Sequence, residues 1–267
     1  MIARIGSLVG AVPFVLRFLF DPAIGADYGV GTLAKLRLIV RFKRNIAELE
    51  TLSSIREHME LARAIFAVPR AVPGDVVECG CYLGGSSANI SLVCKLAGRK
   101  LVIYDSFEGL PEPSEQDRKH VYVHYDASDD YYQGRFAASL DQVKANIARY
   151  GAVEVCEFVK GFFDATLPGS GRNVVLAFLD VDLVDSLKPC LLGIWNNLPE
   201  SCRVYVHEAA SLSLVSLFFD ERWWREQLGG AAPGFVGSGS GLPLTAMVGS
   251  ELGYAQKGSQ LVHDGPA

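Results

Sequence analysis

The sequence predicts an α/β fold in which a mainly parallel sheet is flanked by helices. From residue 75 onward, short apolar runs alternate with segments whose apolar residues repeat at helical spacing, which is typical of successive strand–helix–strand units. Several runs are continuously apolar, as strands buried on both faces are. The predicted strands are residues 75–79, 100–105, 153–159, 173–180 and 203–208.

Apolar stripes predict the helices that cover this sheet. A first helix precedes the sheet, has its stripe at Leu52, Ile55, Met59, Ala62 and Phe66, and ends before Pro69 and Pro73. The later stripes are Ile90, Val93, Cys94 and Ala97 before Gly98; Phe136, Leu140, Val143, Ile147 and Tyr150 before Gly151; and Leu187, Leu191, Ile194 and Leu198. Residues 110–134 and 229–241 fit neither pattern and are predicted to be long loops, which are more often functional lids or disordered segments than incidental connections.

The charge distribution separates the first 45 residues from the rest. The chain of 267 residues has a net charge of -5, which does not favour nucleic acid as a partner. Residues 1–45 nevertheless carry seven basic side chains against Asp21 and Asp27. We therefore expect an N-terminal basic and apolar helical extension at residues 1–45 and one catalytic domain at residues 46–267.

The apolar run at residues 8–20 is too short for a transmembrane span, and Pro13 and Arg17 interrupt it as a signal-peptide core. A helix that packs on the catalytic domain or on a second subunit is the favoured interpretation, with a peripheral membrane contact as the alternative. The six cysteines include no CxxC pair and fall mostly in apolar stretches, so reduced buried thiols are expected. These features favour a cytoplasmic protein and a homo-oligomer.

The segment VVECGCYLGGSS at residues 76–87 predicts a glycine-rich turn between a strand and a helix, where backbone N–H groups can approach a ligand. A dinucleotide fingerprint would need glycine at Tyr82, and a phosphate-binding loop would need lysine where Ser86 stands. S-adenosylmethionine has no phosphate and presents an ammonium, a carboxylate and two ribose hydroxyls, so it suits this turn. The expected cofactor contacts are Glu78, Gly80, Tyr82, Gly84, Gly85 and Ser86.

Asp105 ends the next predicted strand, about 25 residues after Gly80. A carboxylate at this position can accept hydrogen bonds from both ribose hydroxyls of a bound cofactor. An acid after a strand can equally be an ordinary turn or helix cap, so both interpretations stay open for Asp105 alone.

Four stretches in the same order resemble the macrocin O-methyltransferase family over roughly residues 50–210: GDVVECGCYLGGSSA, YDSFEGLPEPSEQD, FVKGFFDATLP and FLDVDLVDSLKPCL. The resemblance implies a Rossmann-like class I methyltransferase fold that uses S-adenosylmethionine. It adds Ser106, Phe107, Gly161 and Phe162 to the cofactor contacts. It also implies methylation of a hydroxyl with help from a divalent metal, typically on sugars of natural products.

Two further strand ends carry the candidate catalytic groups. Asp180 is the expected general base and cofactor neighbour, and Asp182 is a catalytic residue and metal ligand, because carboxylates suit Mg²⁺. The family's paired aspartates followed by tyrosine are His207, Glu208 and alanine in this chain. His207 and Glu208 are candidate ligands, but imidazole shifts the preference toward ions such as Mn²⁺, so the presence and identity of the metal stay open.

Two other functions were weighed against an O-methyltransferase with a small-molecule acceptor. Asp180 and Asp182 could form the D-x-D of a metal-dependent glycosyltransferase, although this leaves the glycine-rich turn unexplained. A scaffold that binds the cofactor without transferring a methyl group is the other alternative. Aromatic and histidine side chains that could touch an acceptor, without being assigned to the site, are His120, Tyr122, His124, Tyr125, Trp223 and Trp224.

Overall fold

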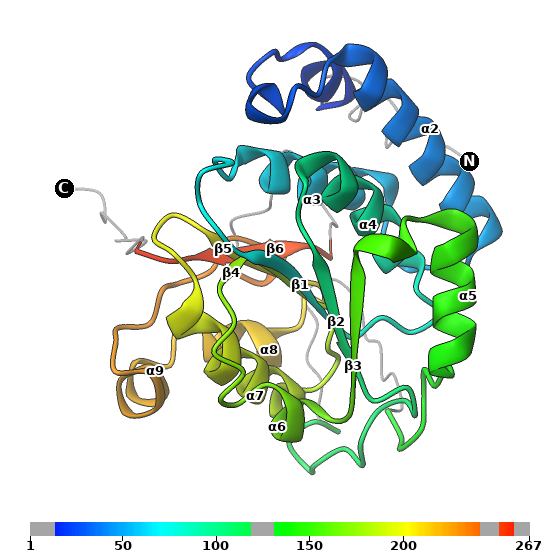
Figure 1. The fold of residues 1–267 in the computed structure, drawn as a ribbon. Coiled ribbons are helices and arrows are strands. Elements are labelled where there is room, and N and C mark those ends of the chain that lie inside the picture. Colours follow the sequence, from blue (N-terminus) through cyan, green and yellow to red (C-terminus); the bar gives the residue numbers. More distant parts are fainter. Residues whose placement is uncertain (1–13, 119–130, 241–250, 259–267) are drawn as a thin grey trace, which may run out of the picture.

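The protein forms a six-stranded sheet with helices on both faces, as the sequence predicts (Figure 1). The computed structural model describes residues 14–118, 131–240 and 251–258. The strand order is β3-β2-β1-β4-β5-β6, and all neighbouring strands are parallel except β5 and β6. The strands are β1 (Asp75–Cys79), β2 (Leu101–Asp105), β3 (Cys156–Lys160), β4 (Val174–Leu179), β5 (Arg203–Val206) and β6 (Gly253–Gln256).

The predicted strands agree with the structure in the middle of the sheet, where burial on both faces requires continuously apolar residues. All six residues of β4 are buried, and β1 has the predicted bounds. The prediction for β3 begins too early, because Val153–Val155 form a short 3-10 helix, η2. The edge strand β6 was not predicted, and it pairs antiparallel to β5 through residues from the far end of the chain.

Helices cover the two faces of the sheet in separate groups (Figure 1). On one face lie α3 (Ile55–Ala67), α4 (Gly85–Ala97) and α5 (Leu140–Tyr150), with α2 (Thr32–Glu48) packed outside them. The other face carries α6 (Phe163–Thr166), α7 (Val184–Ile194), α8 (Leu212–Leu217) and α9 (Glu221–Leu228). Short 3-10 helices are η1 (Ala26–Tyr28), η3 (Trp195–Asn197) and η4 (Ser238–Ser240).

The helical stripe expected to begin at Phe136 begins at Leu140 instead. Ser139 caps α5 by accepting a hydrogen bond from the Gln142 amide, which fixes the first turn there. Phe136 precedes this cap in a left-handed conformation with φ 60°. The apolar spacing thus extended one turn too far, because the cap and not the periodicity decides where a helix starts.

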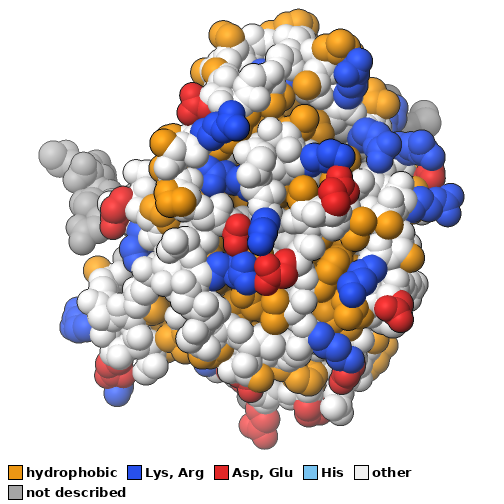
Figure 2. Space-filling view, in the orientation of Figure 1, with side chains coloured by type: hydrophobic (Ala, Val, Ile, Leu, Met, Phe, Trp, Pro, Cys, Tyr) orange, Lys and Arg blue, Asp and Glu red, His pale blue; other side chains and the backbone are white. Residues whose placement is uncertain are grey.

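Helix α2, close to the N-terminus, packs on the helices that cover the sheet. The buried Asn45 of α2 donates from Nδ2 to Asn89 Oδ1 at 2.8 Å and to the Tyr150 carbonyl at 3.0 Å, which ties α2 to both α4 and α5. Lys and Arg side chains gather over α2 on the face shown in Figure 2. No described helix combines the length and apolarity needed to cross a membrane.

Several side chains with an undecided role belong to the core. Trp224 is fully buried and donates from its indole nitrogen to the Leu217 carbonyl at 2.7 Å, so it is a core residue of α9. All six cysteines are free, as expected, and five of them are buried. The loop residues His120, Tyr122, His124 and Tyr125 lie outside the described residues.

Candidate functional site

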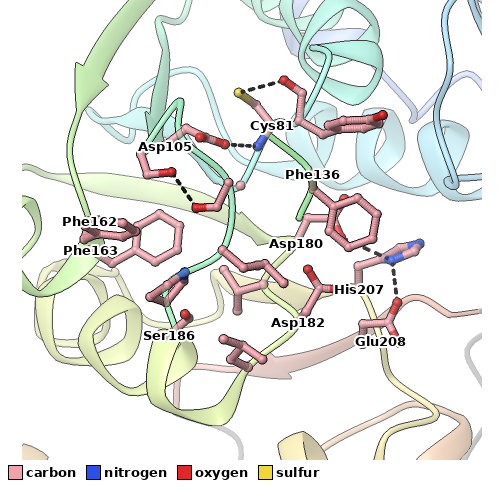
Figure 3. Close-up of a pocket in the computed structure, with 18 of the residues that line it drawn as sticks. Cys81, Asp105, Phe136, Phe162, Phe163, Asp180, Asp182, Ser186, His207 and Glu208 are labelled. Carbon is pink, nitrogen blue, oxygen red and sulfur yellow. Dashed lines mark hydrogen bonds and ion pairs between the residues drawn. The ribbon is translucent and has the colours of Figure 1, made fainter. Parts of the chain in front are cut away.

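A cavity of ≈ 390 Å³ lies at the carboxyl ends of the strands, where β1 and β4 run side by side and the strand order reverses (Figure 3). Ligands of open α/β sheets bind at this switch point because the chain leaves β1 and β4 in opposite directions and opens a crevice. The cavity is lined mainly by residues that follow β1, β2, β4 and β5: Gly80, Cys81, Tyr82, Gly85, Ser86, Asp105, Ser106, Asp180, Val181, Asp182, His207 and Glu208.

The turn after β1 requires glycine at Gly80. This residue has φ +84°, and a Cβ added to it would lie 2.1 Å from the carbonyl oxygen of Asp180. The two chains can therefore meet at the switch point only without a side chain at this position. Tyr82, with φ 45°, is a non-glycine residue in the same strained turn.

Asp105 links two of the loops that line the cavity. Its Oδ2 accepts a hydrogen bond from the Cys81 amide at 2.7 Å, and its Oδ1 accepts one from the Phe107 amide at 2.6 Å. Each carboxylate oxygen keeps a further lone pair for a ligand. Asp105 is therefore both a turn cap and a candidate ligand-binding group, the two interpretations that the sequence left open.

Most predicted cofactor contacts line the cavity, and four do not. Gly80, Tyr82, Gly85, Ser86, Asp105, Ser106, Phe162 and Asp180 are in its lining. Glu78 is completely buried behind the turn, and Gly84 packs as the N-cap of α4 against α5. Phe107 is a core residue, and Gly161 supports the β2 end by donating its amide to the Asp105 carbonyl at 2.9 Å.

Sequence patterns missed the part of the cavity wall that comes from loops. Residues 50–52, between α2 and α3, reach over the glycine-rich turn, where a Cβ on Gly85 would lie 2.7 Å from Thr51 Cβ. Phe136 also lines the cavity, and its ring lies edge-on to Tyr82 with 5.6 Å between centroids. Neither region has a motif of its own, although the glycine pair at residues 84 and 85 signals a close approach.

Asp117 anchors the loop after β2 to the start of α7. This fully buried side chain accepts the Val184 amide through Oδ1 at 2.7 Å and the Ser114 hydroxyl through Oδ2 at 3.0 Å. Its carboxylate therefore caps α7 from a distant loop, and Asp117 lines the cavity together with residues 109–112.

The candidate catalytic groups surround one imidazole ring (Figure 3). His207 Nδ1 lies 3.3 Å from Asp180 Oδ1 and 3.6 Å from Glu208 Oε1. On the other side of the ring, Nε2 lies 4.0 Å from Oε2 of Glu57 in the first turn of α3. The carboxyl end of β4, the end of β5 and a helix that precedes the sheet thus meet at His207.

This cluster shifts the protonation of its members. Burial alone would lower the pKa of His207, but Asp180, Glu208 and Glu57 outweigh it and hold that pKa well above its usual value. Burial, together with the charges of Asp180 and Glu208, raises the pKa of Asp182 to about 8. Burial also raises the pKa of Glu78 to about 8.

The predicted metal ligands Asp182, His207 and Glu208 do not fit together as a metal site. Within residues 14–118, 131–240 and 251–258, no group of three or more His, Cys, Asp or Glu side chains is placed to hold an ion. Metal binding by these residues stays a prediction of the sequence.

Comparison with known proteins settles the family. Residues 53–227 match the model of the macrocin-O-methyltransferase (TylF) family. The chain belongs to this family. The resemblance identified from the sequence is thereby confirmed, and a methyltransferase is favoured over a D-x-D glycosyltransferase.

Curated relatives match part of the chain. An 8-demethyl-8-(2,3-dimethoxy-alpha-L-rhamnosyl)-tetracenomycin-C 4'-O-methyltransferase of Streptomyces olivaceus is 34% identical over 158 residues, which are 51% of this chain and 58% of that protein. A demethyldecarbamoylnovobiocin O-methyltransferase of Streptomyces niveus is 27% identical over 46% of this chain and 48% of its own length. The matches thus span about half of the relatives' lengths.

Solved methyltransferase structures share the Rossmann-like fold. The O-methyltransferase NovP has a TM-score of 0.58 and 19% identity, with 76% of this chain and 80% of that chain covered. The calicheamicin methyltransferase CalS11 has a TM-score of 0.55 and 18% identity, with 84% and 93% covered. At these identities the likeness establishes the fold, which confirms the predicted class I architecture.

Proposed function

We propose that this member of the macrocin-O-methyltransferase family transfers a methyl group from S-adenosylmethionine to a hydroxyl of a small molecule, and that the acceptor is a sugar-bearing natural product. The observation that carries the proposal is one cavity that joins the glycine-rich turn, Asp105 and the Asp180–His207 pair. The name of one relative specifies the 4' position of a rhamnosyl-tetracenomycin, and that of another the 3'' position of mycinamicin III.

The residues around the turn fit S-adenosylmethionine. Gly80 and Gly85 shape the turn after β1 that lines the cavity, and Asp105 has lone pairs for the ribose hydroxyls. Phe162 offers an apolar wall beyond the end of β3. When bound, the cofactor supplies an electrophilic methyl group on a sulfonium.

Asp180 is the proposed general base. Its side chain is 34% exposed at the cavity, and His207 Nδ1 lies within reach to donate a hydrogen bond to Oδ1. As the acceptor oxygen forms its new bond to the methyl carbon and the carbon–sulfur bond breaks, the hydroxyl proton passes to Asp180. Orientation of the reactants can lower the barrier by about 7–11 kcal/mol. A general base accelerates a reaction roughly 10²–10⁴-fold, which corresponds to about 3–5 kcal/mol and is therefore the smaller contribution. The walls of the cavity therefore matter more than the base.

Calorimetry with S-adenosylhomocysteine and with a nucleotide sugar tests the proposed cofactor. We expect binding of the first and none of the second. Binding of the nucleotide sugar alone would overturn the proposal. Transfer of radiolabelled methyl groups to a panel of glycosylated and aglycone acceptors then tests the substrate class. Cofactor binding without any transfer would favour the non-catalytic scaffold.

The variant Asp180→Asn tests the base. We expect affinity for S-adenosylhomocysteine to change little and turnover to fall roughly 10²–10⁴-fold. Asp164→Asn is the matched control, because Asp164 lines the same cavity from α6 and, among the described residues, its carboxylate accepts a hydrogen bond from the neighbouring Ala165 amide. Full turnover of Asp180→Asn would refute the assignment.

A further inference from the structure

His207 is enclosed by acceptors from three separate elements. Asp180 follows β4, Glu208 follows β5 and Glu57 belongs to α3, and each places a carboxylate oxygen within 4.0 Å of a ring nitrogen. The side chain of His207 is only 3% exposed. The ring of Phe178 lies edge-on to the imidazole with 6.3 Å between centroids, which restricts its rotation.

Glu57 cannot turn away from this arrangement. Its Oε2 accepts a hydrogen bond from the Ser54 amide at 2.6 Å in the capping box of α3, and its Oε1 accepts one from the Glu251 amide at 3.1 Å. The helix cap thus fixes the carboxylate that faces Nε2 of His207.

This geometry assigns Nδ1 of His207 to donation, whereas Nε2, 4.0 Å from Glu57, has no hydrogen-bond partner among the described residues. A carboxylate is an acceptor, so a nitrogen directed at one is best satisfied when it carries hydrogen. A nitrogen with hydrogen has no lone pair for a metal. The Nδ1 edge of the ring faces the carboxylates of both Asp180 and Glu208 (Figure 3).

We propose that His207 takes the place of a divalent cation in this site: it holds Asp180 in position as a hydrogen-bond donor and closes the site to metal. The chain would then methylate its acceptor without a metal ion, in contrast to the metal-assisted methylation that the family resemblance implies. His207 is a positioning residue in this scheme, because it acts on the acceptor through Asp180. The inference rests on the proposed methyl transfer.

Titration of the full chain with Mn²⁺, followed by electron paramagnetic resonance in the presence of S-adenosylhomocysteine, tests the closed site. We expect His207→Asp to bind Mn²⁺ at least tenfold more tightly than the wild type, because a third carboxylate then joins Asp180 and Glu208. Asp185→Asn is the matched control: Asp185 lines the cavity but pairs with Lys188, so its loss should leave Mn²⁺ affinity unchanged. Equal affinities of the wild type and His207→Asp would overturn the proposal.

Two other substitutions test the positioning role even if His207→Asp does not fold. Asparagine places its amide nitrogen where Nδ1 stands, whereas glutamine places it nearer to Nε2. We expect turnover in EDTA to be retained within about tenfold by His207→Asn and lost by His207→Gln, with both variants binding S-adenosylhomocysteine like the wild type. Equal loss in both variants, or wild-type turnover abolished by EDTA and restored by Mn²⁺, would refute the inference.

The same samples separate this inference from the proposed function. A wild-type chain that does not bind S-adenosylhomocysteine in calorimetry would refute the proposed cofactor. Binding of S-adenosylhomocysteine together with tight Mn²⁺ binding that Glu208→Gln weakens would refute only the role of His207.

Discussion

Asp117 offers the sharpest test of how the cavity is held together. The variant Asp117→Ala removes the acceptor of the Val184 amide and of the Ser114 hydroxyl, both in a fully buried setting. Loss of a helix cap costs about 0.5–2 kcal/mol. An unsatisfied buried donor costs about 1–3 kcal/mol. The two costs overlap, because both include the loss of the hydrogen bond to the Val184 amide, and they cannot simply be added. We therefore expect the free energy of unfolding to fall by about 2 kcal/mol.

Urea unfolding measures this change, and thermal unfolding should show a melting temperature lower by roughly 4–8 °C for a domain of this size. Asp117→Asn should lose less than Asp117→Ala, because the amide oxygen can still accept the Val184 amide. Asp164→Ala is the matched control for an exposed acid at the same cavity and should change stability by less than about 0.5 kcal/mol. The reasoning fails if Asp117→Ala is as stable as this control.

Three further predictions concern the turn, the core and pH. Gly80→Ala should abolish binding of S-adenosylhomocysteine in calorimetry or prevent folding, because the added Cβ would lie 2.1 Å from a backbone oxygen. The control is Gly98→Ala, which has open space around it: it should lower the free energy of unfolding by only about 1–2 kcal/mol and keep binding. Trp224→Ala should lower the free energy of unfolding in urea by about 3–5 kcal/mol, because Trp224 is fully buried. Trp223 is only half-buried, so Trp223→Ala should lower it by clearly less. Similar losses in the two variants would show that burial does not decide the cost. Burial lowers the pKa of His58 from 6.5 to about 4. Between these pH values the His58 imidazole is protonated in the unfolded chain and neutral in the folded one, so the free energy of unfolding should fall as pH drops from about 6.5 to about 4. His58→Phe should flatten that slope in urea unfolding between pH 7 and pH 4, and an unchanged slope would refute it.

The central sheet and its glycine-rich turn could be predicted because their signals are local. A continuous apolar run marks β4, and Gly80 stands where two backbones meet with no room for a side chain. The acids at the carboxyl ends of β2 and β4 fall at one edge by the rule for parallel sheets, so Asp105 and Asp180 could be placed beside the same cavity from the sequence.

Other features depend on contacts between residues far apart in the chain, which carry no periodic signal. The edge strand β6 joins β5 across about 50 residues, and Asp117 caps a helix that begins 67 residues later. Phe136 continued an apolar stripe, yet the cap at Ser139 moved it out of the helix and into the cavity wall.

The sequence by itself determined the fold class, the family and the strand ends that carry the chemistry, because buried strands and glycine-rich turns depend on residues that are close together in the sequence. Only the tertiary structure decided what surrounds His207. The sequence placed this residue beside Glu208 as a candidate metal ligand. The packing of α3 against the sheet brings Glu57 to 4.0 Å from Nε2 on one side of the ring, while Nδ1 lies 3.3 Å from Asp180 on the other.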